Sequence, residues 1–166
     1  ANVSNTPFRL YKHWVHEGGI STPFIMYYPK GNLKNQINTS VGHIIDIMPT
    51  CLDLAKVEYP TDPKIKPLSG MSLISQMYDN NDRTLFWEHE GNMDIRVADK
   101  KLVKAHENDS WELYDLSEDR TESKNIAAQN QPLVDSLKSV HAEWMTSIGA
   151  LDWNIIQEKY KVIKKD

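Results

Sequence analysis

The feature that most constrains the fold is a series of short strand-like segments between residues 83 and 116. These segments, rich in apolar, aromatic and β-branched residues, are 84–89, 95–97, 101–105 and 111–116. Turn-forming pairs lie between them at Gly91-Asn92 and Asp99-Lys100. Short connections of this kind join antiparallel neighbours. The sequence therefore predicts a four-stranded antiparallel meander.

A long amphipathic helix is expected after the meander. Pro132 suits the first turn of a helix, and Gly149 suits the position just after the last turn. The predicted apolar face, spaced by three and four residues, consists of Leu133, Leu137, Val140, Trp144 and Ile148. We expect this helix to pack on one face of the meander. Residues 151–166 predict a further short helix, with a stripe of Trp153, Ile156, Tyr160 and Ile163.

The first part of the chain reads differently. The continuous apolar run 24–28, closed by Pro29, is typical of a strand buried on both faces, as in a parallel sheet. A helix is predicted over 46–56, with Asp46 as its N-cap and Pro49 in its first turn. Its predicted buried residues are Ile47, Met48, Cys51, Leu52, Leu54 and Ala55. Residues 59–67 contain three prolines and predict an extended connector, so we place a domain boundary between 1–66 and 67–166.

Composition limits the classes of function. The formal net charge of −4 over 166 residues argues against non-specific nucleic-acid binding, which needs a basic surface. No apolar run approaches the roughly 20 residues of a membrane span. The single cysteine, Cys51, excludes an internal disulfide and a zinc site built from cysteines.

Several motifs occur in a specific order. Lys12 is followed by Glu17-Gly18-Gly19 and Pro23, and Phe-Trp-Glu-His-Glu-Gly-Asn occupies 86–92. Further downstream are Arg96, Lys101-Leu-Val, the stretch 111–116 and Asp119-Arg-Thr-Glu122. Over roughly the first 150 residues this series resembles the type I sulfatases, the arylsulfatase-like branch of the alkaline phosphatase superfamily. The tail after Gly149 matches no pattern of that family.

The resemblance implies an α/β fold of which this chain is the C-terminal portion. Residues 1–66 would be the last strand and helix of the large α/β sulfatase domain. Residues 67–166 would be the small C-terminal subdomain, a four-stranded antiparallel sheet packed against a helix. The parent protein would hydrolyse sulfate esters of sugars or aryl alcohols, and in a bacterium it would be periplasmic or secreted.

The family's nucleophile and metal are not expected within this chain. Type I sulfatases use a formylglycine made from Cys or Ser in Cys/Ser-x-Pro-x-Arg, and Cys51-Leu-Asp-Leu-Ala does not fit that pattern. Cys51 is therefore predicted to lie in the core of its helix. The divalent ion, usually calcium, is held by oxygen ligands upstream of the Lys-x-x-x-x-Glu-Gly-Gly segment. We assign no metal ligands here, because Asp46 of the pair His43/Asp46 is better explained as a helix cap. The isolated fragment is expected to be inactive without the remaining N-terminal part of the sulfatase.

The resemblance makes Lys12 the candidate catalytic residue, because an ammonium near the sulfate oxygens stabilises negative charge in the transition state. His89 is a candidate substrate-binding residue at the end of a strand, with pairing to Glu88 or Glu90 as the alternative. His16, Asn92 and Arg96 are further candidates for substrate contacts. A structural hydrogen bond remains open for His16, and a clamp on a turn or carboxylate remains open for Arg96. Gly18-Gly19 is expected to form a tight turn, aided by positive φ, that aims the preceding residues.

Two other functions stay open. One is a phosphonate or phosphodiester hydrolase of the same superfamily. The other is a non-catalytic glycan-binding or interaction module, against which the predicted strand and helix of a larger domain argue.

Overall fold

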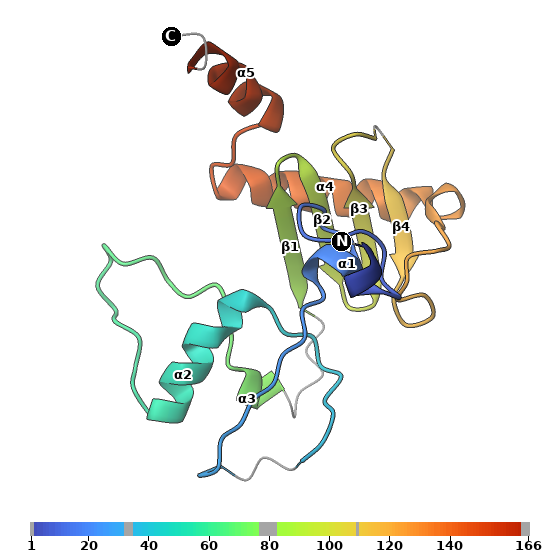
Figure 1. The fold of residues 1–166 in the computed structure, drawn as a ribbon. Coiled ribbons are helices and arrows are strands. Elements are labelled where there is room, and N and C mark those ends of the chain that lie inside the picture. Colours follow the sequence, from blue (N-terminus) through green and yellow to red (C-terminus); the bar gives the residue numbers. More distant parts are fainter. Residues whose placement is uncertain (1, 32–34, 77–82, 109, 164–166) are drawn as a thin grey trace. The chain divides into compact units, whose positions relative to one another are not determined.

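The computed structural model describes residues 2–31, 35–76, 83–108 and 110–163. These residues form two compact units (Figure 1). One unit consists of Ala1–Phe24 and Arg83–Asp166, and the other consists of Ile25–Asp82. The predicted division into 1–66 and 67–166 concerns the domains of a parent enzyme and stays a prediction.

The first unit is built on an antiparallel sheet of four strands in the order β1-β2-β3-β4. The strands are β1 (Thr84–His89), β2 (Asn92–Val97), β3 (Lys100–Lys104) and β4 (Glu112–Asp115). The predicted meander is thus confirmed, although two turns lie one residue earlier than expected. They are formed by Glu90-Gly91 and Ala98-Asp99, and Glu90, Gly91 and Ala98 all have positive φ, as tight hairpin turns require.

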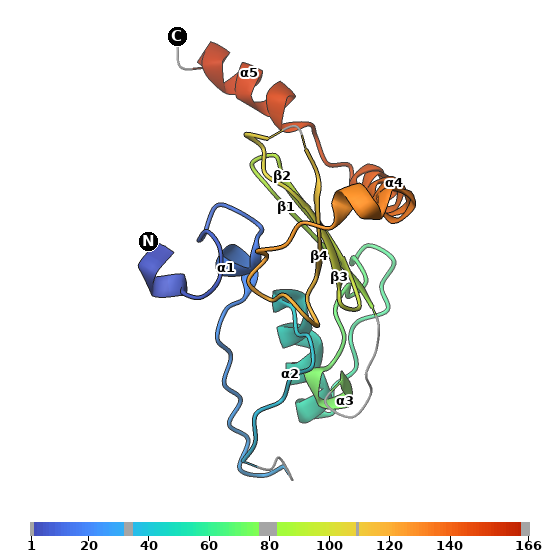
Figure 2. The same ribbon diagram turned by 90° about the vertical axis from the view of Figure 1, so that its right-hand side faces the viewer.

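One face of the sheet is apolar and packs against helix α4 (Gln131–Ser147) (Figures 1 and 2). The residues Ile95, Leu102 and Leu113 are direct neighbours across β2, β3 and β4, and each is fully buried. They form one hydrophobic cluster with Val134 and Leu137 of α4. The predicted packing of a helix on the meander is therefore confirmed, and Gly149 follows α4 with a φ of 67°.

The buried face of α4 differs from the predicted one. Val140 and Ile148 are 39% and 54% exposed, whereas Val134, Leu137 and His141 are buried. The reason is aromatic packing, because the His141 ring lies within 6.2 Å, between ring centroids, of three aromatic rings on α4 and the sheet side. These are Phe86, Trp111 and Trp144. These aromatic contacts place His141, and not the aliphatic Val140, in the core between α4 and the sheet.

The opposite face of the sheet is covered by the N-terminal segment, here residues 8–20, which ends in α1 (Glu17–Ile20) (Figure 2). Val15 packs there against Val103, Tyr114 and Leu116. Strand alternation also places the charged residues Asp94, Lys101 and Glu112 on this face, opposite the apolar row. The two faces of the sheet are therefore held by different kinds of interaction.

Gly18 and Gly19 serve a purpose other than the predicted one. Both lie in α1, and neither has a positive φ. A Cβ atom on Gly18 would overlap the carbonyl oxygens of Arg9 and Leu10, and one on Gly19 would overlap the carbonyl oxygen of Trp14. The two glycines are thus required because the N-terminal segment folds back closely on itself.

The remaining elements of the first unit are short. They are η1 (Asn2–Asn5), η3 (Ala127–Gln129) and α5 (Trp153–Ile163), the last of which confirms the predicted final helix. None of the helices in the described ranges combines the length and the apolar content that crossing a membrane requires.

The second unit contains η2 (Ile44–Asp46), α2 (Ile47–Ala55) and α3 (Leu73–Gln76). The predicted helix is confirmed in α2, but Asp46 makes no side-chain cap for it. The Asp46 carboxylate instead accepts hydrogen bonds from the backbone amides of His43 and Met71, at 2.7 and 3.1 Å. Asp46 therefore holds the backbone around η2, and the assignment of no metal ligand to His43 and Asp46 stays a prediction.

Two expectations for the second region are wrong. Residues 24–28 form no strand, and Phe24, Ile25 and Tyr27 are 60%, 92% and 86% exposed. The physical reason is that a strand of a parallel sheet needs neighbouring strands, and the described residues of the second unit contain none. Cys51 is exposed and is not a helix-core cysteine, and Met48 on the same helix is 56% exposed.

Candidate functional site

Lys12 lies on an exposed turn of the N-terminal segment. The turn is closed by a hydrogen bond from the Trp14 amide to the Tyr11 carbonyl, 3.1 Å long. His13, the next residue, has a φ of 108°, which is unfavourable for a residue with a Cβ. The surrounding structure must therefore hold the backbone of His13 in this conformation. The side chain of Lys12, the preceding residue, is exposed to solvent.

A buried ion-pair cluster fixes the segment that carries Lys12. Lys101 Nζ lies 3.2 Å from Glu17 Oε1, 3.4 Å from Asp94 Oδ2 and 2.9 Å from Glu122 Oε1. Arg120 reaches the other oxygen of Glu17 at 3.0 Å, and the Glu17 amide donates to Glu122 at 2.9 Å. Glu17, Lys101 and Glu122 come from three separate sequence motifs, and Asp94 lies two residues before Arg96. These four side chains meet in one buried cluster. Glu17 thus holds its own turn on the sheet.

The charges of this cluster are unbalanced. Burial raises the pKa of Asp94 to about 7, the nearby Lys101 opposes this shift, and the carboxylates of Glu122 and Glu17 add to it. Burial also opposes ionisation of Glu17, but Lys101 and Arg120 outweigh it and hold the pKa of Glu17 below its usual range. Lys101 keeps its charge, because three carboxyl groups raise its pKa despite the burial. Asp94 consequently takes up a proton near neutral pH.

A second polar group joins the N-terminal segment to β4. Arg9 donates to the Tyr114 hydroxyl at 2.6 Å and to the Glu122 carbonyl at 2.8 Å. His16 Nε2 lies 3.2 Å from Glu112 Oε2, and this hydrogen bond, despite burial, helps to lower the pKa of Glu112 to about 2. His16 itself is 1% exposed, so the structural hydrogen bond left open for it is present. Its role in substrate binding stays a prediction.

Asn92 has a structural role in this chain. Its side-chain amide nitrogen donates to the carbonyl oxygens of His13 and His89, at 3.1 and 2.9 Å, and its Oδ1 accepts from the amide of His106 at 3.0 Å. The residue is 2% exposed. Both amide protons and the side-chain oxygen are engaged, so Asn92 positions its neighbours, and its contact with substrate stays a prediction.

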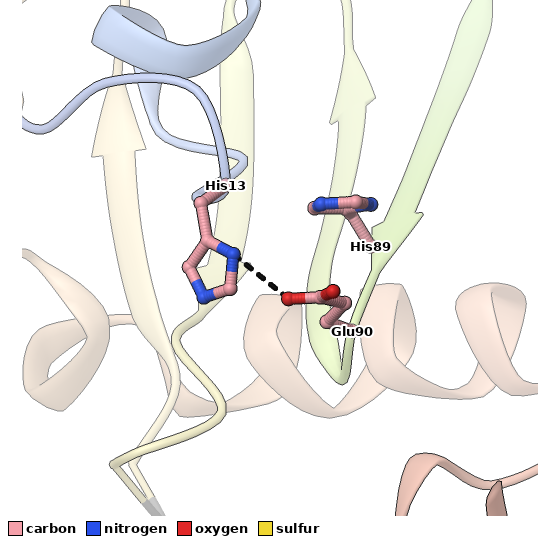
Figure 3. Close-up of side chains that lie close together, drawn as sticks. All are labelled: His13, His89 and Glu90. Carbon is pink, nitrogen blue, oxygen red and sulfur yellow. Dashed lines mark ion pairs between the residues drawn. The ribbon is translucent and has the colours of Figure 1, made fainter.

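His89 lies where strand β1 ends, as predicted, and is exposed. Its ring stands 5.7 Å from that of His13, between centroids, at an angle of 88°. Glu90 is paired with His13, with 2.8 Å between Oε2 and Nδ1 (Figure 3). Glu88 accepts a hydrogen bond from the amide of Gly91. The two glutamates that were considered as partners of His89 therefore have other partners.

Arg96 clamps a turn, which was the alternative left open for it. Its Nε donates to the Ala98 carbonyl at 2.8 Å, and its guanidinium lies 3.8 Å from Asp99. Arg96 thus stabilises the β2–β3 hairpin, and its contact with substrate stays a prediction.

An open pocket of about 220 Å³ borders this region, all within the first unit. It is lined by His13, Trp14, Glu90, Asn92, His106, Glu107, Trp153 and Gln157. Of the site residues predicted from the sequence, Asn92 lines this pocket, whereas His13 and Glu90 were not predicted as site residues. The sequence signals near these two residues were Lys12, which precedes His13, and His89, which precedes Glu90.

The fold and these motifs define a sulfatase-type C-terminal region, and comparison with known proteins agrees. A family model described as N-sulphoglucosamine sulphohydrolase, C-terminal, matches residues 8–146. The chain therefore belongs to this sulfatase family.

Individual relatives are sulfatases too. A sulfatase of Formosa agariphila is 33% identical over 147 residues, which cover 77% of this chain and 26% of the relative. An N-acetylglucosamine-6-O-sulfatase of Bacteroides thetaiotaomicron is 28% identical over 131 residues, which cover 69% of this chain and 23% of the relative. The crystal structure of Ps i-CgsB shares the fold, with a TM-score of 0.72 at 20% identity, over 84% of this chain and 32% of that one. The chain thus spans about a quarter to a third of these proteins.

The residues present do not fit the calcium ion that the family implies. Among the described residues, the group of His, Cys, Asp or Glu side chains close enough to share an ion is His13, His89 and Glu90. Calcium takes six to eight oxygen ligands, whereas this group offers two imidazoles and one carboxylate. No step of the chemistry is therefore assigned to calcium through these residues.

Proposed function

We propose that this chain is part of an enzyme that hydrolyses sulfate esters of sugars, and that it supplies Lys12 as a sulfate contact. One observation carries the proposal. Glu17 of the Lys-x-x-x-x-Glu-Gly-Gly motif is buried on Lys101, which anchors the segment of Lys12 to the sheet that bears His89. A catalytic cation must be held in place before the reaction, and a buried ion pair restricts the movement of its segment.

Lys12 would stabilise negative charge and would not transfer a proton. Cleavage of a sulfate ester builds negative charge on the sulfuryl oxygens and on the leaving oxygen, and an ammonium directed at them stabilises the transition state more than the ground state. The nucleophile, a formylglycine in this proposal, and the divalent ion would come from the remaining N-terminal part of the enzyme.

His89 would contribute to recognition of the sugar. It is exposed at the edge of the sheet, and Asn92 ties its backbone to that of His13 beside Lys12. An imidazole in this position can donate to or accept from a hydroxyl group. A sugar substrate is favoured by the N-acetylglucosamine-6-O-sulfatase among the relatives and by a structure of Ps i-CgsB in complex with k-i-k-neocarrahexaose. A periplasmic or secreted location belongs to the same proposal.

The test uses the full-length protein that contains this chain. Initial rates are measured on a sulfated amino sugar, on 4-nitrophenyl sulfate and on an aryl phosphodiester. We expect turnover of both sulfates, with negligible hydrolysis of the phosphodiester and no activity of the isolated 166-residue chain. A preference for the phosphodiester would favour the other hydrolase class of the superfamily. Activity of the isolated chain above a heat-inactivated control would contradict the assignment of the nucleophile to the missing part.

A further inference from the structure

We propose that His13, His89 and Glu90 form a binding site for a divalent cation of the zinc class (Figure 3). This goes beyond the sulfatase function, which assigns no metal ligand to this chain. The three side chains come from the N-terminal segment, from the end of β1 and from the following turn.

The donor set fits zinc. One ligand atom from each of the three residues lies within 4.8 Å of the other two, and His13 Nδ1 and Glu90 Oε2 are 2.8 Å apart. Two imidazole nitrogens and one carboxylate are a ligand set that zinc uses with a fourth position left for water or another small ligand. Softer imidazole ligands also favour zinc, copper and nickel over calcium and magnesium.

The backbone around the site is organised for this arrangement. The buried amide of Asn92 donates to the carbonyls of both histidine residues, so their main chains are fixed to the same group. His13 and Glu90 also adopt positive φ angles of 108° and 52°. Such conformations persist where the surrounding structure imposes them, and they gather at functional sites.

The ion pair of His13 and Glu90 does not account for this organisation. Their side chains are 46% and 39% exposed, and an ion pair in that setting contributes little to stability. The same exposure leaves the donors accessible to an ion from solvent, and the open pocket beside them provides an entry path.

The experiment titrates Zn²⁺ into the 166-residue chain by isothermal titration calorimetry, with Co²⁺ absorption as a second readout of the coordination. The variants are His13→Gln, His89→Gln and Glu90→Gln. The matched controls are His106→Gln and Glu107→Gln, which alter residues of the same pocket outside the three proposed ligands. Circular dichroism and urea unfolding establish that each variant is folded.

We expect one Zn²⁺ per chain and a loss of at least about tenfold in affinity for each ligand variant, since even the loss of groups that only orient metal ligands has effects of 10–100-fold. The controls should bind within about twofold of the unaltered chain. Absence of stoichiometric binding, or equal losses in ligand and control variants, would overturn the site. If the isolated chain is unfolded, the same titration on the full-length enzyme saturated with Ca²⁺ decides the question. Because the readout is binding, the result is independent of whether the enzyme cleaves a sulfate ester.

Discussion

Lys101 of β3 and Glu17 of the N-terminal segment are 84 positions apart in sequence and share a buried ion pair, 3.2 Å between Nζ and Oε1. Neither side chain is more than 3% exposed. The pair attaches the N-terminal segment, which also carries Lys12, to the sheet, because Glu17 lies in that segment and Lys101 lies in β3. The predictions below test this attachment and the roles of the residues near it.

Replacement of Lys101 should destabilise the chain strongly. Lys101→Met leaves the carboxyl groups of Glu17, Asp94 and Glu122 buried without their cation, and loss of one partner of a buried pair costs roughly 3–5 kcal/mol. Urea unfolding followed by circular dichroism measures the effect. Lys100→Met, which removes a half-exposed partner of Asp115, is the control and should cost less than about 1 kcal/mol. Similar losses of unfolding free energy in both variants would show that the buried cluster stabilises the chain no more than a half-exposed ion pair does.

Asp94→Asn should make the chain more stable, and the gain should be larger at pH 8 than at pH 5. The pKa of Asp94 is about 7 in the folded chain and near 3.8 in the unfolded chain, so only the folded chain keeps this proton between those values. Its contribution to the unfolding free energy therefore falls as pH rises through this range, by up to about 1.4 kcal/mol per pH unit. A neutral Asn removes that loss and keeps a side-chain oxygen beside Lys101.

The Asp94 measurement compares the variant with the unaltered chain at each pH. This is needed because burial lowers the pKa of His141, which makes stability rise with pH in part of the same range. Asp115→Asn is the control, since the hydrogen bond with Lys100 lowers the pKa of Asp115 and its titration is complete below pH 5. A difference between Asp94→Asn and the unaltered chain that does not change with pH would contradict the assigned pKa.

Lys12→Ala in the full-length enzyme should reduce kcat far more than it changes stability. A group directed at developing charge contributes about 3 kcal/mol, which corresponds to roughly a hundredfold in rate. Lys12 is exposed, so its removal leaves no buried group without a partner. Lys138→Ala, on the exposed side of α4, is the control and should retain full turnover. Near-normal turnover of Lys12→Ala would return this residue to an ordinary surface lysine.

His89→Ala should affect the choice of substrate more than the chemical step. A hydrogen bond to a sugar hydroxyl is worth about 0.5–1.5 kcal/mol when both groups are neutral and up to about 3 when one is charged. We therefore expect kcat/KM to fall for the sulfated sugar and to change little for 4-nitrophenyl sulfate, which has a good leaving group and no hydroxyl to recognise. Equal losses on both substrates would make His89 a general acid or a folding element. No loss on either would place it outside the substrate site.

The sequence predicted the sheet and α4 because their periodicity is local. Each strand pairs with its neighbour along the chain, and each connection is short enough for turn residues to identify. The face of α4 was predicted less well, because aliphatic spacing favoured Val140 and gave no weight to His141, which aromatic neighbours bury. Residues 24–28 show the converse error, since an apolar run does not reveal whether neighbouring strands exist to pair with it.

The polar face of the sheet was beyond the reach of sequence patterns. Lys101 and Asp94 are charged residues in short strands, and such residues are almost always assigned to the solvent side. Their burial depends on Glu17 and Glu122, which no local pattern connects with them. The family motifs identified most of the participants, but only the folded arrangement shows that they form one cluster and that burial raises the pKa of Asp94.

The covering of this polar face has a consequence for the order of events during synthesis. Ribosomes release a chain from its N-terminus at about 5–20 residues per second, so the N-terminal segment emerges well before the strand that bears Lys101. The hairpins of the sheet can close as soon as each is released, since their partners are adjacent. Lys12 is therefore synthesised before Lys101, the residue that fixes its segment to the sheet. On a ribosome stalled before β3, the segment that carries Lys12 would lack this ion pair.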